Sequence, residues 1–166
     1  LPKGKAYYSF VVLYLLFMVD FMSRTGVNSL VPLIQTDLGL TDTQVGMISS
    51  VVMIGMVVFV LPVTYFADKF SRKKTVVVLS LFWGISVLVS SQVESYTALL
   101  ITRFFVGLGC SGYAAISTSM ISGWFAEEQR GKALSIYDTA MDVGAAVAAA
   151  ACGMLAGMMG WQATLL

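Results

Sequence analysis

Five ionisable residues lie inside long apolar stretches of this sequence: Asp20, Arg24, Arg103, Asp138 and Asp142. Asp20 and Arg24 are four positions apart, as are Asp138 and Asp142, so each pair shares one face of a helix. An arginine fork binds carboxylate or phosphate, and carboxylates exchange protons. The alternative is that the charges only pair with one another to hold helices together, for which Asp20 with Arg24 is the natural candidate. Two like charges on one helix face are harder to explain that way.

The elements that carry these residues are predicted to be transmembrane helices. The 166 residues are 58% hydrophobic and 11% charged, with a mean hydropathy of +0.84, whereas a soluble domain has about 25% charged residues. A spanning helix needs about 20 mostly apolar residues. Five stretches fit, and a sixth starts near Trp161: 7–31, 43–67, 75–91, 96–122 and 133–159. We therefore predict an all-α membrane protein, with Thr41 capping the second helix.

Basic residues outside these stretches fall on one side of the predicted bundle. They are Lys3, Lys5, Lys69, Arg72, Lys73, Lys74, Arg130 and Lys132. The opposite loops carry only acidic residues: Asp37, Asp42 and Glu94. Because Lys and Arg concentrate in cytoplasmic loops, the N-terminus is predicted to be cytoplasmic. Charges at membrane depth normally face a bundle interior or a water-filled cavity, so the first, fourth and fifth helices are expected to line something polar.

Several function classes receive no support from the sequence. It contains no histidine, and Cys110 and Cys152 both lie in apolar stretches, so we expect no metal, no cofactor and no enzyme activity. The net charge of +1 gives no reason to expect a nucleic acid partner. Gly107, Gly109 and Gly112 spell G-x-G-x-x-G, but a dinucleotide site needs a preceding strand, so we interpret them as helix packing. A six-span channel or receptor stays open, although the short outer loops leave no room for a selectivity loop.

The segment 64–74 reads TYFADKFSRKK and resembles the signature G-x-x-x-D-[RK]-x-G-[RK]-[RK] of the major facilitator superfamily. The matching residues are Asp68, Lys69, Arg72 and Lys73. Thr64 and Ser71 replace the two glycines. RFFVGLG at 103–109 is similar to the R-x-x-x-G element of that family's fourth helix. The segment 124–136 and the pair Gly160-Trp161 resemble the entries to its fifth and sixth helices.

This resemblance covers the whole chain and implies two six-helix bundles, each built from inverted three-helix repeats, around a central cavity. Residues 1–166 would form the N-terminal bundle, with the sixth helix truncated and the C-terminal half absent. The family implies that helices 1, 2, 4 and 5 face the cavity. It also implies a gating role at the cytoplasmic side for Asp68, Lys69, Arg72, Lys73 and Arg130.

The resemblance further implies a secondary active transporter in the bacterial inner membrane, working by alternating access. Arg24 resembles an arginine that contacts anionic substrates in the organophosphate and anion:cation symporter branches, and Arg103 matches one in vesicular organic-anion carriers. We therefore expect a small organic anion, a carboxylate or phosphate ester, moved by proton symport or exchange. A drug:proton antiporter or a sugar transporter of the same superfamily is the alternative, although the Gly-Pro pair of the drug antiporters is absent from the fifth helix.

The sequence departs from the symporter pattern in the fourth helix. Cys110 stands where a glutamate often follows the arginine, and Ala115 stands where a proline is common. Proton coupling therefore needs another carboxylate, and Asp20, Asp138 and Asp142 are the candidates. Repulsion between two carboxylates on one face favours proton binding by one of them.

Overall fold

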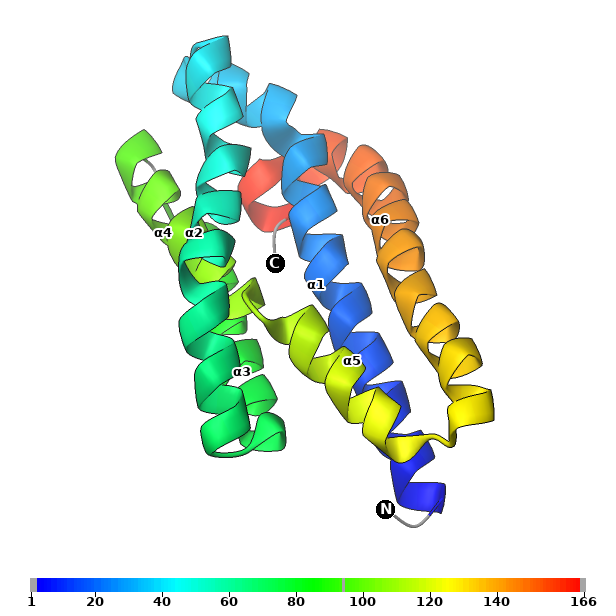
Figure 1. Cartoon of the computed structure of the whole chain (residues 1–166). Coiled ribbons are helices and arrows are strands. Elements are labelled where there is room, and N and C mark those ends of the chain that lie inside the picture. Colours follow the sequence, from blue (N-terminus) through cyan, green and yellow to red (C-terminus); the bar gives the residue numbers. More distant parts are fainter. Residues whose placement is uncertain (1–2, 94, 165–166) are drawn as a thin grey trace.

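Six helices follow one another in the part of the chain that the structure, a computed structural model, describes, residues 3–93 and 95–164. They are α1 (Lys3–Leu38), α2 (Asp42–Lys69), α3 (Arg72–Ser90), α4 (Tyr96–Cys110), α5 (Tyr113–Trp124) and α6 (Glu127–Thr164). Short turns connect them, and the chain rises and descends as an antiparallel bundle (Figure 1). Thr41 caps α2 as predicted, because its side chain accepts a hydrogen bond from the Gln44 amide in a reciprocal capping box.

Four helical segments of the described residues are long and apolar enough to cross a membrane: Gly4–Leu38, Asp42–Lys69, Arg72–Ser90 and Tyr96–Trp124. The fifth predicted span lies in α6, whose many alanines and glycines contribute less hydropathy than the Leu, Val and Ile of the earlier helices. Nevertheless α6 packs along the length of α1 and completes the bundle. Large apolar side chains of α2 and α3, such as Leu61 and Val78, are exposed, as expected of surfaces that face lipid.

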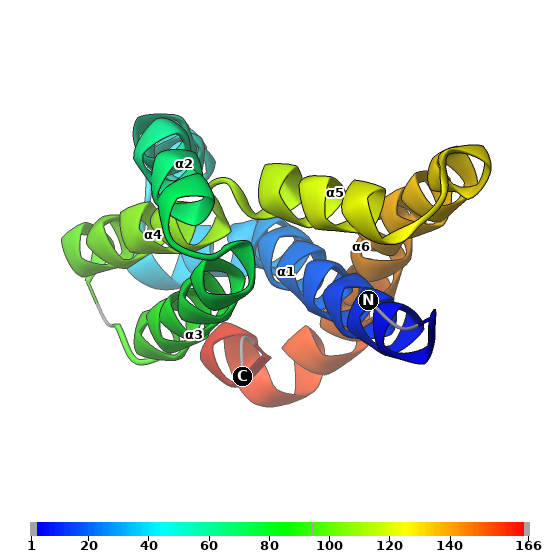
Figure 2. The ribbon, with the colours of Figure 1, turned by 60° about the horizontal axis from the view of Figure 1, so that its bottom comes forward.

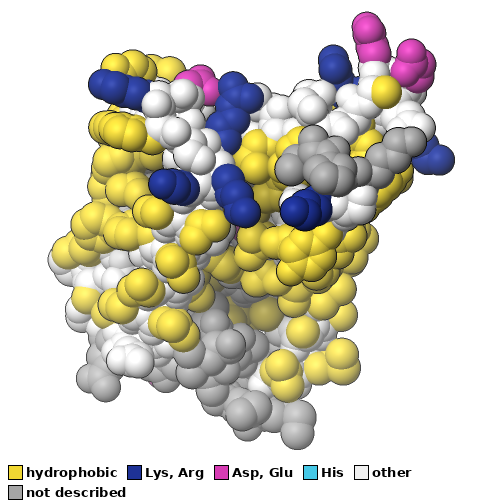
Figure 3. Space-filling view, turned by 90° about the horizontal axis from the view of Figure 1, so that it is seen from below, with side chains coloured by type: hydrophobic (Ala, Val, Ile, Leu, Met, Phe, Trp, Pro, Cys, Tyr) yellow, Lys and Arg dark blue, Asp and Glu magenta, His cyan; other side chains and the backbone are white. Residues whose placement is uncertain are grey.

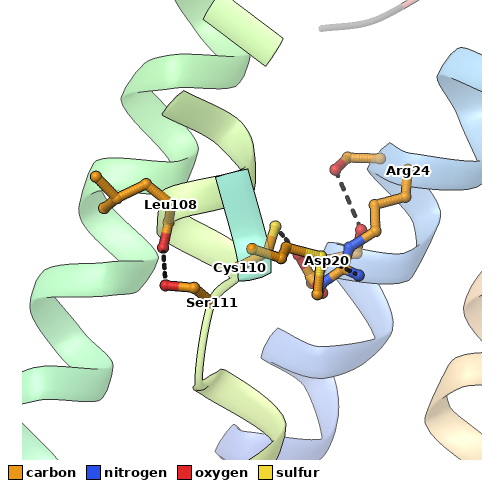
Figure 4. A network of polar contacts seen from close by, with 7 residues as sticks. Asp20, Arg24, Leu108, Cys110 and Ser111 are labelled. Carbon is orange, nitrogen blue, oxygen red and sulfur yellow. Dashed lines mark hydrogen bonds and ion pairs between the residues drawn. The ribbon is translucent and has the colours of Figure 1, made fainter. Parts of the chain in front are cut away.

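The predicted fourth span, 96–122, is interrupted in the middle. Gly112 has a φ of +68° between α4 and α5, a left-handed conformation that suits glycine and ends the α4 hydrogen-bond ladder. The Ser111 hydroxyl donates a hydrogen bond to the Leu108 carbonyl at 2.6 Å (Figure 4). It thereby satisfies one of the carbonyl groups that have no intrahelical donor at the end of α4. An added Cβ at Gly112 would lie 3.0 Å from Val63 of α2. The predicted span therefore consists of two helical segments, α4 and α5, and Tyr96–Trp124 as a whole is long and apolar enough to cross a membrane.

The start of a separate sixth helix near Trp161 is not seen, because α6 continues as one helix through Thr164. Its final turns, red in Figure 1, bend away from the line of the earlier part. The glycines Gly153, Gly157 and Gly160 fall in this stretch, and glycine permits such bending.

Two helix pairs pack most closely, α1 with α6 and α2 with α4. Glycines bring their backbones together: an added Cβ at Gly55 of α2 would lie 2.5 Å from the carbonyl oxygen of Phe104 in α4. A Cβ at Gly144 of α6 would overlap the Met18 carbonyl of α1. Such contacts are typical of transmembrane bundles. Figure 2 shows the resulting arrangement, with α2, α3 and α4 on one side of α1, and α5 and the first part of α6 on the other.

Candidate functional site

Asp20 and Arg24 form an ion pair on one face of α1. Arg24 Nη2 lies 2.5 Å from Asp20 Oδ2, and the thiol of Cys110 donates to the other carboxylate oxygen at 2.8 Å (Figure 4). Asp20 is 5% exposed, so its charge depends on these partners. The Arg24 guanidinium also lies over the Phe21 ring, 5.0 Å from its centroid, and reaches the Met56 sulfur of α2 at 3.5 Å. Three helices therefore hold this pair.

Arg103 of α4 is the second buried cation, and its surroundings differ. It is 2% exposed, and its Nε and Nη2 atoms have no acceptor among the described residues. None of the described carboxylates forms an ion pair with it. A buried charge without a partner is strongly unfavourable, and a charged group is retained in such a place only for a reason. The arrangement is therefore suited to an anion supplied from outside this chain.

The two arginines line one pocket of about 110 Å³ between α1, α2 and α4. The other lining residues are mostly apolar: Val27, Asn28, Ile48, Ser49, Val52, Met53, Met56 and Val106. The exceptions are Asn28 and Ser49, whose side chains share a 3.0 Å hydrogen bond. With Asp20 ionised, the cluster of Asp20, Arg24 and Arg103 has one net positive charge. The pocket thus combines two guanidinium groups, a neutral polar pair and apolar walls, which is a combination that suits a small organic anion.

Asp138 and Asp142, the other predicted proton-coupling residues, lie elsewhere. Both are exposed on α6, and neither lines the arginine pocket. Neither belongs to an ion pair among the described residues. The structure therefore brings together Asp20, Arg24 and Arg103 but not the two aspartates of α6.

The residues of the predicted gating motif gather at one end of the bundle. Asp68 and Arg72 form an exposed ion pair of 2.8 Å across the turn between α2 and α3. Lys69 lies over the Tyr65 and Phe70 rings, and Lys73 and Arg130 are exposed. Figure 3 looks at the molecule from below, the end at which α2 ends and α3 and α6 begin, and shows Lys and Arg side chains spread over it.

Sequence reasoning missed three features of this site: the Cys110 contact with Asp20, the Met56 contact with Arg24, and the Asn28–Ser49 pair. Asn28 follows Arg24 by four residues and so shares its helix face, a signal that was available. Ser49 and Met56 depend on how α2 is rotated against α1, which a single sequence does not fix.

Long apolar helices packed around a pocket lined by two arginines define a multi-pass membrane protein. Residues 13–166 match the model of the Major Facilitator Superfamily. The chain belongs to that superfamily, so the family resemblance and the all-α fold are confirmed. The superfamily comprises transporters, in agreement with the expectation that the chain is not an enzyme.

Among its relatives, a probable sulfoacetate transporter of Cupriavidus necator is 27% identical over 91% of this chain and 35% of its own length. A hexuronate transporter of Bacillus subtilis is 26% identical over 93% of this chain and 36% of its own. Human protein spinster homolog 1 is 30% identical over 87% of this chain and 28% of its own. The chain thus spans about a third of the length of these relatives.

The fold is shared with a bacterial homolog of the human lysosomal transporter spinster. Its crystal structure in an inward-facing and unoccupied conformation superposes with a TM-score of 0.88 at 24% identity, covering 96% of this chain and 33% of that one. The occupied conformation gives a TM-score of 0.86.

Proposed function

We propose that this chain forms the N-terminal half of a secondary active transporter that moves a small organic anion, a carboxylate or phosphate ester, by alternating access. The observation that carries the proposal is Arg103, a buried guanidinium whose Nε and Nη2 atoms find no acceptor among the described residues, and which shares a pocket with Arg24. The names of relatives support it, because sulfoacetate and hexuronate are organic anions. A C-terminal six-helix half would complete the central cavity.

In this proposal the two arginines bind the anion in different ways. No carboxylate in the described part of the chain pairs with Arg103, which can therefore receive the anion, whereas the charge of Arg24 is offset by Asp20 at 2.5 Å. Protonation of Asp20 leaves Arg24 available, so the pocket then presents two uncompensated guanidinium groups. Proton binding and anion binding therefore favour each other, which is the thermodynamic requirement for symport.

Other residues take supporting roles in the proposal. Asp138 and Asp142 are further proton carriers on α6, and their exposure leaves them open to the cavity that two halves would enclose. Asp68, Lys69, Arg72, Lys73 and Arg130 brace the cytoplasmic ends of the two halves. The protein resides in the bacterial inner membrane with a cytoplasmic N-terminus, because the basic end of the bundle favours the cytoplasmic side.

The test is uptake by proteoliposomes that contain the full-length protein, with labelled carboxylates, phosphate esters and neutral sugars. Arg24→Gln and Arg103→Gln are expected to abolish saturable anion uptake, and Arg103→Lys to restore little, because lysine lacks the paired donors. Lys5→Gln, at an exposed position outside the pocket, is the control. Uptake of neutral or cationic compounds alone, unaffected by the arginine variants, would refute the anion assignment in favour of a sugar or drug carrier.

A second arm of this experiment compares aspartate variants with and without an inward proton gradient. Asp20→Asn is expected to remove gradient-driven accumulation but to retain exchange of internal for external anion. The same comparison for Asp138→Asn and Asp142→Asn shows whether either takes part in coupling. Asp68→Asn is expected to slow both modes while membrane insertion stays normal. Full accumulation by Asp20→Asn would exclude Asp20 as the coupling residue.

A further inference from the structure

We propose that a hydrated row of buried hydroxyl groups, on Tyr113, Ser117 and Tyr137, connects Asp20 with Asp138 on the surface of α6 and carries the coupling proton. The proposal rests on the proposed role of Asp20 as a proton carrier. It assigns a transport task to groups in the bundle core that lie outside the anion pocket.

The three hydroxyl groups of this row are buried and lack partners. Tyr113, Tyr137 and Ser117 are 4%, 1% and 0% exposed, and their hydroxyl oxygens form no hydrogen bond within residues 3–93 and 95–164. Buried polar groups are nearly always satisfied, and each one that is not costs free energy. Phenylalanine and alanine would fill the same positions without that cost, so the hydroxyl groups call for a role beyond packing.

A small space next to Asp20 has the properties of a water site. It measures about 10 Å³ and is lined by Asp20, Ser80, Trp83 and Tyr113, among others. A single water needs at least about 10 Å³ and two to four polar partners. The indole N–H of Trp83 is also buried and has no acceptor in the described part of the chain. A water there accepts from Trp83 and donates to Asp20, and its remaining hydrogen-bonding sites serve Tyr113.

In the proposal the row continues from this site through Ser117 and Tyr137. Ser117 follows Tyr113 by one turn of α5 and lies beside both phenol groups, close to them but outside hydrogen-bonding geometry. Phe17 of α1 stacks on both rings, with centroid distances of 6.1 Å to Tyr113 and 4.7 Å to Tyr137. Asp138 directly follows Tyr137 on α6 and is exposed, and in the proposal it is the acceptor at the outer end of the row.

Proton transfer along this row is balanced at every step. The acid form of Asp20 gives its proton to the water, the water passes another to Tyr113, and each hydroxyl releases one proton as it receives one. Asp138 takes up the last, so only the two carboxylates change charge. The charged and titratable groups that face Asp20 are Arg24 on α1, Cys110 on α4, Tyr113 on α5 and Tyr137 on α6.

The experiment uses Tyr113→Phe and Tyr137→Phe in the full-length protein in proteoliposomes. Each is expected to slow proton-driven anion accumulation at least about tenfold, while anion exchange at equal pH on both sides stays unchanged. Tyr14→Phe is the matched control, because the Tyr14 hydroxyl also lies between α1 and α6, 3.3 Å from that of Thr139, but is outside the row. Loss of an unpartnered hydroxyl is not expected to lower the melting temperature.

The outcomes separate this proposal from the one on which it rests. If Asp20→Asn loses accumulation but both phenylalanine variants keep it, the hydroxyl row is refuted and the role of Asp20 stands. If Asp20→Asn itself keeps accumulation, the coupling role of Asp20 fails and the row fails with it. Should a phenylalanine variant be poorly folded, Ser117→Ala tests the middle of the row, with the same slowing expected and unchanged accumulation counting against it.

Discussion

Arg24 and Arg103 share a pocket but differ in the balance of charge around them. Arg24 is paired with a buried carboxylate and is in contact with an aromatic ring, whereas Arg103 lacks a described acidic partner and is more deeply buried. Removing one member of a buried ion pair leaves the other charge uncompensated, which is destabilising. Removing a buried charge that has no partner instead removes an unfavourable contribution to the free energy of folding. The same substitution should therefore have opposite effects on stability at the two sites.

We expect Arg24→Gln to lower the free energy of unfolding by up to about 3 kcal/mol, since Asp20 loses its cation and solvent screens part of the interaction. Arg103→Gln is expected to raise the melting temperature of the ligand-free protein although it abolishes anion binding. Thermal unfolding in detergent, followed by intrinsic tryptophan fluorescence, measures both. A marked loss of stability in Arg103→Gln would mean that Arg103 has a structural partner.

The Asn28–Ser49 pair is the neutral polar part of the pocket. Its hydrogen-bonding groups can exchange their 3.0 Å contact for contacts with substrate. We expect Asn28→Leu to reduce uptake of hydroxylated anions about tenfold or more, relative to unsubstituted anions of equal length. The reason is that the hydroxyl group of the substrate loses its hydrogen-bond partner when leucine replaces asparagine. Competition uptake with matched pairs of anions measures the ratio. An equal loss for both members of each pair would contradict a role in selectivity.

At the scale of the helices, glycines determine which elements approach most closely. Gly144 lets α6 contact the backbone of α1, whereas an added Cβ at Gly84 of α3 has none of the described atoms within 4 Å. We expect Gly144→Ala to destabilise the bundle, because the new methyl group overlaps the Met18 carbonyl. Gly84→Ala is the matched control and should leave the melting temperature unchanged or raise it slightly, since alanine favours the helix. Equal melting temperatures for the two variants would show that this contact relaxes without cost.

The sequence predicted the helices well but not how they are interrupted or rotated. Apolar stretches of about 20 residues identify helices, and Thr41 was recognisable as a cap. The break at Gly112 was not predicted, because one residue with positive φ barely changes the hydropathy of the stretch around it. Arg24 and Arg103 were recognisable from the sequence because each is a charge inside an apolar stretch. The Cys110–Asp20 contact was not recognisable, because it depends on packing between α4 and α1.

At the scale of the whole molecule, packing follows the inverted repeat that the family resemblance implied. The predicted first and fifth helices, α1 and α6, pack closely against each other. The predicted fourth and second helices, α4 and α2, form the corresponding close pair. Under a three-helix repeat helices 1 and 4 are equivalent, as are helices 2 and 5, so the two close pairs are copies of one contact. Each copy contributes one arginine to the pocket.

The orientation of the bundle is testable by labelling. In a variant without native cysteines, an impermeant maleimide added to intact cells is expected to label Thr43→Cys but not Lys74→Cys, because the basic end should be cytoplasmic. Both positions are exposed, whereas Cys110 and Cys152 are buried and should resist labelling in the parent protein. Permeabilised cells, in which Lys74→Cys should become reactive, are the control. The reverse pattern would place the N-terminus outside.

The two close pairs also bear on how the bundle deforms. Backbone contacts through glycine hold α1 to α6 and α2 to α4, whereas α1 contacts α2 far less. Sliding is therefore easier between the two pairs than within either, and Arg24 and Arg103 lie on opposite sides of that seam. An anion held by both guanidinium groups would link the α1–α6 pair to the α2–α4 pair. Its binding would therefore make the bundle more rigid, and its release would let the two pairs slide past each other.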